Sequence, residues 1–232
     1  SDSMDNRHIL IVVPIYNEVD KIGDTIKGLK KVKLIDEILI IDDGSTDDTA
    51  KVLEKFDVSI ISLSKNKGKG YAMRKAIKDK EYDFMGFVDG DLGETSKEVE
   101  KLIKPVISNE VDFTIAKFPQ SSSNTKTKGG FGLVKKLAKK GVYFYTKKEI
   151  NTSLSGQRVY KKEIMKHMKY IPNRYGIEVA MTIQALQNGF TFKEVPVNMT
   201  HRYTDRSLKG FKHRGKQFWD ILKTLIVMFF RR

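Results

Sequence analysis

Short apolar runs alternate with amphipathic stretches along the first half of the chain. The apolar runs have the length and composition of strands, which we expect at residues 8–13, 37–41, 58–63, 83–88 and 111–117. The stretches between them place apolar side chains at helical spacing, which predicts helices at residues 19–31, 47–56, 71–80 and 95–108. Strands that alternate with helices indicate an α/β fold with a mostly parallel central sheet flanked by helices.

Two of these helices have polar residues at their starts that are typical of caps. Thr46 or Asp47 would cap the helix at 47–56, and Thr95 followed by Glu98 has the pattern of a capping box. Such side chains accept hydrogen bonds from backbone N–H groups that have no partner inside the helix. We therefore expect both helices to begin at these residues.

The pattern changes after the fifth expected strand. Residues 119–132 are rich in Ser, Thr, Lys and Gly and have no apolar period, which predicts a long loop of the kind that often covers a substrate. Pro196 places the last expected strand at an edge of the sheet, because proline cannot donate a backbone hydrogen bond. The elements expected beyond the loop are a basic helix at 133–145, a strand at 157–161, a helix at 178–187 and, last, the edge strand with Pro196, at 192–197.

Residues 211–232 are a separate basic and apolar segment, which we expect to form an amphipathic C-terminal helix. Its apolar run is shorter than the roughly 20 residues that span a bilayer. An interfacial helix attracted to anionic lipid fits the pattern; a core helix docked on the sheet and a helix ahead of a true membrane segment are the alternatives. Residues 5–210 are expected to form a single domain. The basic residues at and before the helix are Arg206, Lys209, Lys212, Arg214 and Lys216.

Composition narrows the classes of partner and chemistry. The net charge of +14 favours polyanionic partners, namely nucleic acid, nucleotide phosphates or an anionic membrane. General enrichment in lysine would give the same charge without such a partner. The sequence has no cysteine, which excludes disulfides, thiol nucleophiles and thiolate metal sites. The four histidines have no paired spacing typical of a metal site.

Four polar clusters follow the first four expected strands, at residues 14–18, 42–47, 65–70 and 89–91. The carboxyl ends of parallel strands share one edge of a sheet, where glycine-rich turns and helix N-termini offer free N–H groups to a nucleotide's phosphates. Asp89 and Asp91 add hard oxygen ligands, which suit Mg²⁺ or Mn²⁺ bound with a diphosphate. Singly, each cluster has a structural explanation, such as an Asx turn or a helix cap; together they indicate a nucleotide site.

The P-loop motif is absent, and so is the dinucleotide fingerprint from the first turn. With its four clusters in this order, the chain resembles the family-2 glycosyltransferases of the GT-A nucleotide-sugar fold, over about residues 8–210. It is most similar to the polyprenyl-phosphate sugar transferases of the dolichyl-phosphate and undecaprenyl-phosphate type. The segments that carry this second similarity are 155–160, 176–178, 195–197 and 202–203.

The resemblance implies an inverting, metal-dependent enzyme that uses Mg²⁺ or Mn²⁺. It would transfer a sugar from a nucleotide-diphosphate sugar, a UDP-sugar rather than GDP-mannose, to a polyprenyl phosphate. Residues 5–118 would bind the donor and residues 119–210 the acceptor. The enzyme would be cytoplasmic and peripheral at the inner face of the cell membrane, in contact with anionic lipid.

Two other functions remain open. The same donor chemistry could serve a saccharide acceptor in cell-wall or capsule glycan synthesis. A non-enzymatic basic module that binds nucleic acid would explain the charge but not the four clusters, so nucleic acid is not an expected partner.

The resemblance also implies roles for individual residues. Asp89 and Asp91 would hold the metal, and Asp91 and Arg202 would act in catalysis, with Arg202 on a phosphate. Glu178 would be the general base for a sugar hydroxyl, or an acid that positions Arg158 or Arg202; a lipid phosphate is already ionised and needs no base. The branch often has glutamine where this chain has Gly93. Acceptor-binding residues would be Ser155, Gln157, Arg158 and Tyr203. Donor-binding residues would be Pro14, Tyr16, Asn17, Glu18, Asp42, Asp43, Ser45, Lys67, Lys69, Asp89 and Gly90.

Overall fold

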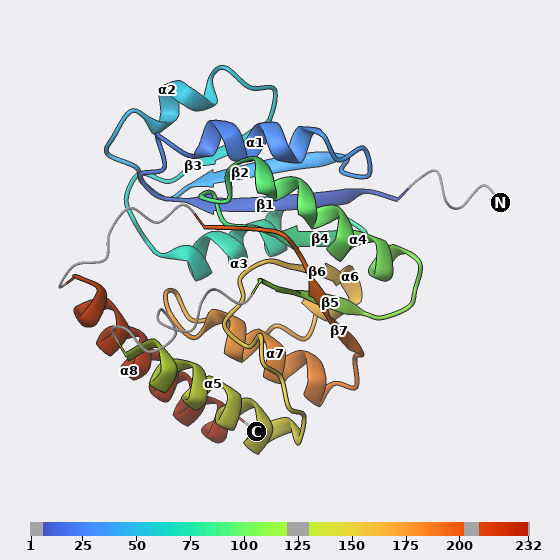
Figure 1. Cartoon of the computed structure of the whole chain (residues 1–232), viewed down its shortest axis with the longest axis vertical. Helices are drawn as coiled ribbons and strands as arrows, with labels where there is room; N and C mark the ends of the chain where they lie inside the picture. The colour runs from blue at the N-terminus through green and yellow to red at the C-terminus, as the bar shows by residue number, and fades with distance from the viewer. Residues whose placement is uncertain (1–6, 120–129, 202–208, 232) are drawn as a thin grey trace.

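A seven-stranded sheet forms the centre of the computed structural model, which describes residues 7–119, 130–201 and 209–231 (Figure 1). The strands lie in the order β3-β2-β1-β4-β6-β5-β7. They are β1 (Ile9–Ile15), β2 (Glu37–Asp42), β3 (Ser59–Ser62), β4 (Phe84–Phe87), β5 (Phe113–Lys117), β6 (Arg158–Lys161) and β7 (Phe192–Pro196).

All the strand pairs are parallel except those of β6, which runs antiparallel to both β4 and β5. The predicted mostly parallel sheet is therefore confirmed, as is the edge position of the strand that contains Pro196. Because β6 runs the opposite way, its first residue, Arg158, pairs with Phe87 at the end of β4. The segment that leads into β6 thus reaches the edge where the parallel strands end.

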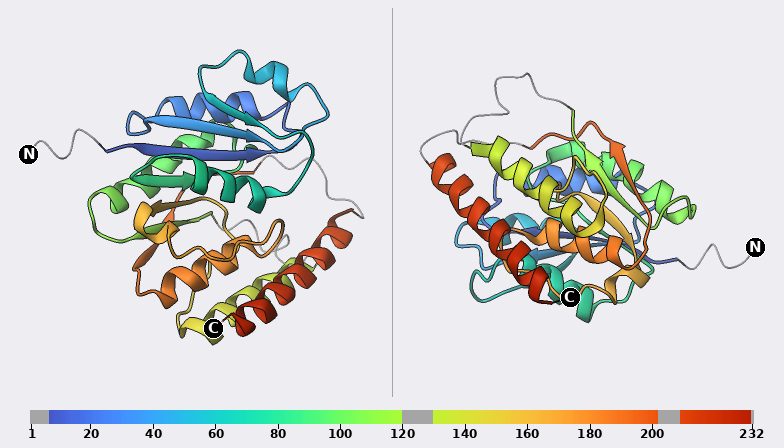
Figure 2. Two further views of the ribbon diagram at one scale, coloured as in Figure 1. Left: turned by 180° about the vertical axis from the view of Figure 1, so that it is seen from behind. Right: turned by 90° about the horizontal axis from the view of Figure 1, so that it is seen from below.

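Two hydrophobic cores cover the two faces of the sheet, and β1 supplies both by strict alternation. Leu10 and Val12 belong to one core, with side chains of α3, α5, α7 and α8. Ile11 and Val13 belong to the other, with side chains of α1, η1 and α4. The two sets of helices lie on opposite sides of the sheet in Figures 1 and 2. The helices are α1 (Ile22–Lys30), α2 (Thr49–Leu53), α3 (Lys69–Asp79), η1 (3₁₀, Gly93–Val99), α4 (Glu100–Ile107), α5 (Phe131–Thr146), α6 (Lys162–Met165), α7 (Ile177–Gln187) and α8 (Lys209–Phe230).

Of the two predicted helix caps, the capping box at Thr95 and Glu98 is wrong. The Thr95 hydroxyl donates to the Leu92 carbonyl at 2.6 Å, and the Glu98 carboxylate accepts from the backbone N–H of Asn198 at 2.8 Å. The expected helix at 95–108 is accordingly a 3₁₀ segment followed by α4. At α2 the predicted Asp47 does accept, through its carboxylate, from the backbone N–H of Thr49, the first residue of the helix, at 3.0 Å. At Thr95 and Glu98, by contrast, other partners bind the side chains that the local pattern assigns to a cap.

The expected C-terminal helix is present as α8, and it docks on α5 and α7. One side of it is buried through Ile221, Thr224 and Met228, as the alternative of a docked helix predicts. In the described parts of the chain, no helix has the length and apolar character needed to cross a membrane. Residues 120–129 of the expected loop lie outside the described residues.

Candidate active site

The second and third polar clusters form one structure around Asp43, which directly follows β2. One oxygen of its carboxylate accepts from the backbone N–H of Lys67 at 2.8 Å. The other accepts from the Gly68 N–H at 2.9 Å and the Asn66 amide at 3.0 Å. Gly68 has a φ of +106°, which a residue with a side chain rarely adopts. Asp43 thus fixes the glycine turn that begins α3.

The first cluster packs against the second through Asn17, whose φ of +52° is unusual for a residue with a side chain. Its backbone N–H donates to the Ser45 hydroxyl at 2.9 Å, and its side-chain oxygen accepts from the Thr46 N–H at 2.8 Å. The Asp42 carboxylate accepts from the Ser45 N–H at 3.0 Å. Tyr16 lies beside this framework with 45% of its surface exposed, so its ring is accessible to a planar ligand.

Three further predicted donor residues lie around these turns. Pro14 is part of β1, one residue before its end. The backbone N–H of Glu18 donates to the Thr49 hydroxyl at 3.2 Å. The Lys67 ammonium lies over the Tyr71 ring, 4.7 Å from its centroid.

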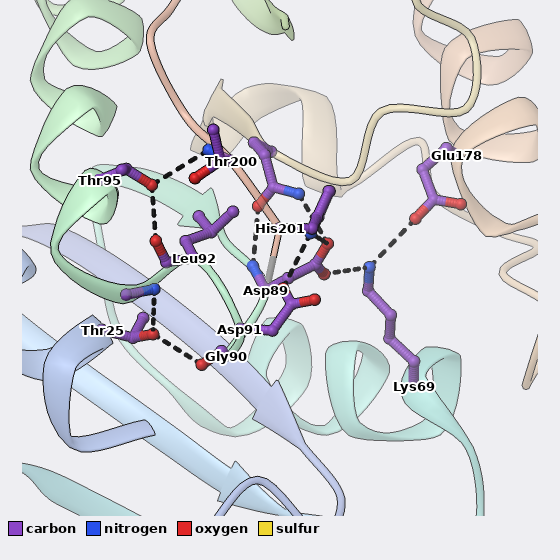
Figure 3. A network of polar contacts seen from close by, with 12 residues as sticks. Thr25, Lys69, Asp89, Gly90, Asp91, Leu92, Thr95, Glu178, Thr200 and His201 are labelled. Atoms are coloured by element: carbon purple, nitrogen blue, oxygen red, sulfur yellow. Dashed lines mark hydrogen bonds and ion pairs between the residues drawn. The ribbon is translucent and has the colours of Figure 1, made fainter. Parts of the chain in front are cut away.

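The Asp89 carboxylate lies at the centre of a polar network that joins both halves of the chain (Figure 3). It accepts from the Lys69 ammonium at 2.9 Å, and Lys69 also reaches the Glu178 carboxylate at 3.2 Å. Gln157 binds Asp89 twice: its amide nitrogen donates to the carboxylate at 2.7 Å, and its oxygen accepts from the Asp89 N–H at 2.8 Å. The α3 N-terminus, the β4 end, the β6 start and α7 therefore meet at one point.

The turn after β4 is held in place by Thr25, a residue that no pattern in the sequence indicated as part of the site. The Thr25 hydroxyl donates to the Gly90 carbonyl at 2.6 Å and accepts from the Gly93 N–H at 2.9 Å. A side chain on Gly90 would lie 2.6 Å from a methyl carbon of Ile15. Close contact with β1 thus requires glycine between the two aspartates.

His201, which the sequence analysis missed, lies against the aspartate pair. Its Nδ1 is 2.8 Å from the Asp91 carboxylate and 3.9 Å from that of Asp89, and its ring stacks on Phe118. One ligand atom from each of Asp89, Asp91 and His201 lies within 4.8 Å of the others. Since 110 positions separate His201 from Asp91, no local spacing connects them. The available signal was its place just after the last strand, where the earlier clusters also occur.

Electrostatic coupling within the network is strong. Burial opposes charge on Asp89, but Lys69 and then His201 outweigh it and lower the pKa of Asp89 to about 2. Glu18 shows the opposite effect, since burial and then the nearby charge of Asp91 raise its pKa to about 7. Burial is the larger cause; the part of the shift that comes from Asp91 reflects repulsion between neighbouring carboxylates, which a bound cation would relieve.

The predicted acceptor residues lie in different environments. Arg158 is buried, and its guanidinium donates to the Thr182 hydroxyl at 2.6 Å and the Ser155 carbonyl at 2.7 Å. It meets Glu178 through the backbone carbonyl at 3.4 Å, so the Glu178 carboxylate does not position Arg158, contrary to one of our alternatives. Ser155 has a buried hydroxyl without a hydrogen-bond partner among the described residues. The predicted Arg202 and Tyr203 lie outside the described residues.

Together these features define a class of protein. The sheet is covered by helices on both faces, polar turns follow β1 and β2, and an acidic pair follows β4. This is the arrangement of a GT-A nucleotide-sugar transferase. Residues 10–169 match Glycosyl transferase family 2. The chain belongs to this family of glycosyltransferases.

Individual relatives agree with this assignment. An uncharacterized protein of Methanocaldococcus jannaschii is 31% identical, over 86% of this chain and 84% of its own length. The UDP-N-acetylglucosamine–dolichyl-phosphate N-acetylglucosaminyltransferase of Methanococcus voltae is 26% identical, over 88% of this chain and 90% of its own. Among solved structures, glucosyl-3-phosphoglycerate synthase from Mycobacterium tuberculosis, in complex with Mn²⁺, UDP and glucosyl-3-phosphoglycerate, has a TM-score of 0.80 at 22% identity. That match covers 97% of this chain and 81% of the synthase, and it shows a common fold.

Proposed function

We propose that this glycosyltransferase transfers a sugar, with inversion, from a UDP-sugar to a polyprenyl phosphate. The proposed donor is supported by one observation above all: Asp89, Asp91 and His201 lie together at the edge of the sheet where the parallel strands end. Tyr16 and Asp43 lie at the same edge. The lipid acceptor is supported by the Methanococcus voltae relative, whose name specifies dolichyl phosphate. Such an acceptor implies work at a membrane, and we propose the cytoplasmic face.

The residues present fit a divalent cation. Asp89 and Asp91 offer carboxylate oxygens, which suit Mg²⁺ and Mn²⁺ alike, and the imidazole of His201 favours the transition metal. We therefore propose Mn²⁺ ahead of Mg²⁺, with these three residues as its ligands. When bound, the ion would stabilise negative charge on the departing nucleoside diphosphate.

The chain's own residues would bind and orient the donor. Tyr16 would stack on the base. Asp43 holds the glycine turn at Gly68 in place through its bonds to the backbone N–H groups of Lys67 and Gly68. Lys69 would supply a fixed positive charge beside the diphosphate. During transfer, the bond between the anomeric carbon and the diphosphate oxygen breaks, and its electron pair leaves with UDP. An oxygen of the lipid phosphate forms the new bond from the opposite side.

A lipid phosphate makes a general base unnecessary, because it is already ionised at neutral pH. The proposal therefore gives Glu178 a positioning role, as the partner of Lys69. With a saccharide acceptor, in cell-wall or capsule synthesis, Glu178 would instead accept the proton of the attacking hydroxyl. Glu178→Gln separates the two by the size of the effect: the amide oxygen can still accept from Lys69, so a positioning role is only weakened, whereas an amide cannot take the proton of a hydroxyl and transfer to a saccharide would be lost.

The direct test is release of UDP from UDP-sugars with Mn²⁺ and a short polyprenyl phosphate. We expect release to require the lipid phosphate, to stop with a chelator, and to fall at least about a hundredfold in Asp91→Asn. Asp79→Asn is the matched control, because Asp79 pairs with Lys75 on α3, away from the aspartate pair. Release stimulated by saccharides and not by the lipid phosphate would overturn the proposed acceptor. If UDP with Mn²⁺ fails to raise the melting temperature of the wild type, the proposed donor site is wrong.

A further inference from the structure

Helices α5 and α8 lie side by side and run in the same direction along one side of the molecule (Figures 1 and 2). Near their N-termini the Arg214 guanidinium lies 4.6 Å from the Phe131 ring. Ten residues further along α5, a side chain on Gly141 would lie 2.5 Å from Leu225, so glycine permits the close approach. The Tyr145 hydroxyl donates to the Leu225 carbonyl at 2.5 Å. The two helices therefore form one continuous surface.

The outer side of α8 is apolar. Trp219, Ile226 and Phe230 are spaced i, i+7 and i+11, which aligns them along one stripe of the helix. Their exposed fractions are 68%, 52% and 81%. The opposite side of α8 is the one that Ile221 and Met228 bury against the protein. Docking on the protein explains only the buried apolar side of α8. The exposed apolar stripe on its other side therefore indicates a further binding partner.

The neighbouring helix α5 extends this apolar surface. It exposes Leu133, Tyr143 and Phe144. Between the helices lies an open apolar groove of about 310 Å³, a volume suited to a slender hydrocarbon chain. The groove is lined by Gly141, Phe144, Tyr145, Leu225, Ile226 and Phe229.

The charges beside this surface are almost all positive. No acidic residue occurs in α5, and α8 contains a single one, Asp220. A second copy of the chain, related by a twofold axis, would set these cations against their own kind. The phosphates of an anionic bilayer would neutralise them instead. Just beyond α5 lies one exposed acidic residue, Glu149. The exposed basic residues on and just beyond the two helices are Lys135, Lys136, Lys140, Lys147, Lys148, Lys216, Lys223 and Arg231.

We propose that α5 and α8 together form a docking surface for an anionic lipid bilayer, with both helix axes parallel to the membrane plane. The exposed aromatic side chains enter the interface, and a lipid hydrocarbon chain occupies the groove. This inference rests on the proposed lipid acceptor for its biological purpose. It assigns membrane contact to a folded two-helix surface that includes α5, not to the C-terminal segment alone.

Trp219 provides the test, because it is the only tryptophan in the chain. The full chain is titrated with vesicles of phosphatidylglycerol or of phosphatidylcholine, and tryptophan emission is recorded. We expect a blue shift and quenching by brominated lipid with phosphatidylglycerol vesicles, both weakened by high salt. The absence of any shift, or an equal shift with both lipids, overturns the proposal. So does a shift that depends on protein concentration without vesicles, which would assign the surface to a second copy.

Two double variants divide the apolar from the charged contribution. Phe229→Ser with Phe230→Ser, and separately Lys136→Glu with Lys140→Glu, should each weaken vesicle binding at least about tenfold. Ile60→Ser is the control, since Ile60 is another exposed apolar residue, on β3 at the far edge of the sheet. Unchanged vesicle binding in both double variants contradicts the proposal. UDP binding without lipid is measured alongside, so that loss of the donor site is recognised separately.

Discussion

Lys69 is the residue that connects the glycine turn before α3 to the rest of the site. It lies at the N-terminus of α3 and contacts carboxylates from two distant segments, Asp89 after β4 and Glu178 on α7. These two carboxylates outweigh the effect of burial and raise the pKa of Lys69, so it is a permanent cation at neutral pH. Its charge therefore holds the two acids together.

Lys69→Met should lower kcat/KM about a hundredfold, corresponding to about 3 kcal/mol of lost electrostatic stabilisation. Steady-state kinetics of UDP release measures the effect. Lys75→Met is a matched control on the same helix, where Lys75 only pairs with Asp79 at the surface. Equal activity in the two variants would show that Lys69 has no role beyond that of an ordinary surface lysine.

Gly70, one residue further along α3, allows the loop at Pro172 to approach the helix closely, and its backbone N–H donates to the Asn173 carbonyl at 2.7 Å. A side chain there would lie 1.7 Å from the Pro172 carbonyl oxygen, a backbone atom that cannot rotate away. Gly70→Ala should therefore lower the free energy of unfolding by about 1–3 kcal/mol in urea denaturation. Gly23→Ala, on α1, meets nothing nearer than 3.6 Å and should be neutral or slightly stabilising. An unaffected Gly70→Ala would mean that the loop at Pro172 yields easily.

At this scale the sequence predicted which residue types would gather, but not all of their contacts. The acidic pair and the lysine-glycine turn were recognisable because each follows a strand with a clear apolar pattern. His201 was not, because its relation to Asp91 exists only after the chain has crossed the sheet several times. Arg158 was expected to face an acceptor, whereas the structure surrounds it with protein acceptors such as Thr182.

Among the elements, β5, β6 and β7 are joined by Asp112, just before β5. Its carboxylate accepts from the Thr191 N–H at 2.8 Å, ahead of β7, and from the Lys161 ammonium at 3.0 Å, at the end of β6. Although burial opposes ionisation, the bond from Thr191 and then Lys161 outweigh it and lower the pKa of Asp112. The folded state thus prefers the charged carboxylate.

Asp112→Asn should cost about 1 kcal/mol of stability at pH 7. A lowered folded-state pKa contributes stability above the unfolded value, and this contribution is lost as the pH falls through the folded pKa. The difference between wild type and variant should accordingly shrink below about pH 4. Urea denaturation at pH 7 and pH 3 measures it, with the exposed Asp57→Asn as the control. A difference that grows on acidification would contradict this account.

The order and type of the elements followed well from apolar periodicity, because most of them bury one clear face. The capping box at Thr95 and Glu98 failed because a cap is a local contact that a distant donor such as Asn198 can displace, whereas the Asp47 carboxylate does bind the first N–H of α2. The antiparallel direction of β6 could not be read from the sequence, since a buried strand has the same pattern in either direction.

For the whole molecule, the charge of +14 is a source of repulsion that folding must overcome. Raising NaCl from about 0.02 to about 0.3 M shortens the screening length and should raise the melting temperature by about 2–4 °C, equivalent to roughly 1 kcal/mol for a chain of this size. Scanning calorimetry in chloride salts tests this. A falling melting temperature would mean that the native ion pairs, which salt also weakens, contribute more than the repulsion.

The insertion of β6 between β4 and β5 has a consequence for synthesis of the protein. On the ribosome, β4 emerges with one edge open, and β5 emerges with neither of its partners yet made. The sheet cannot close until Arg158–Lys161 has been translated, and β7 follows later still. Open strand edges promote aggregation. Nascent chains that stall between β5 and β6 are therefore the ones we expect chaperones to retain.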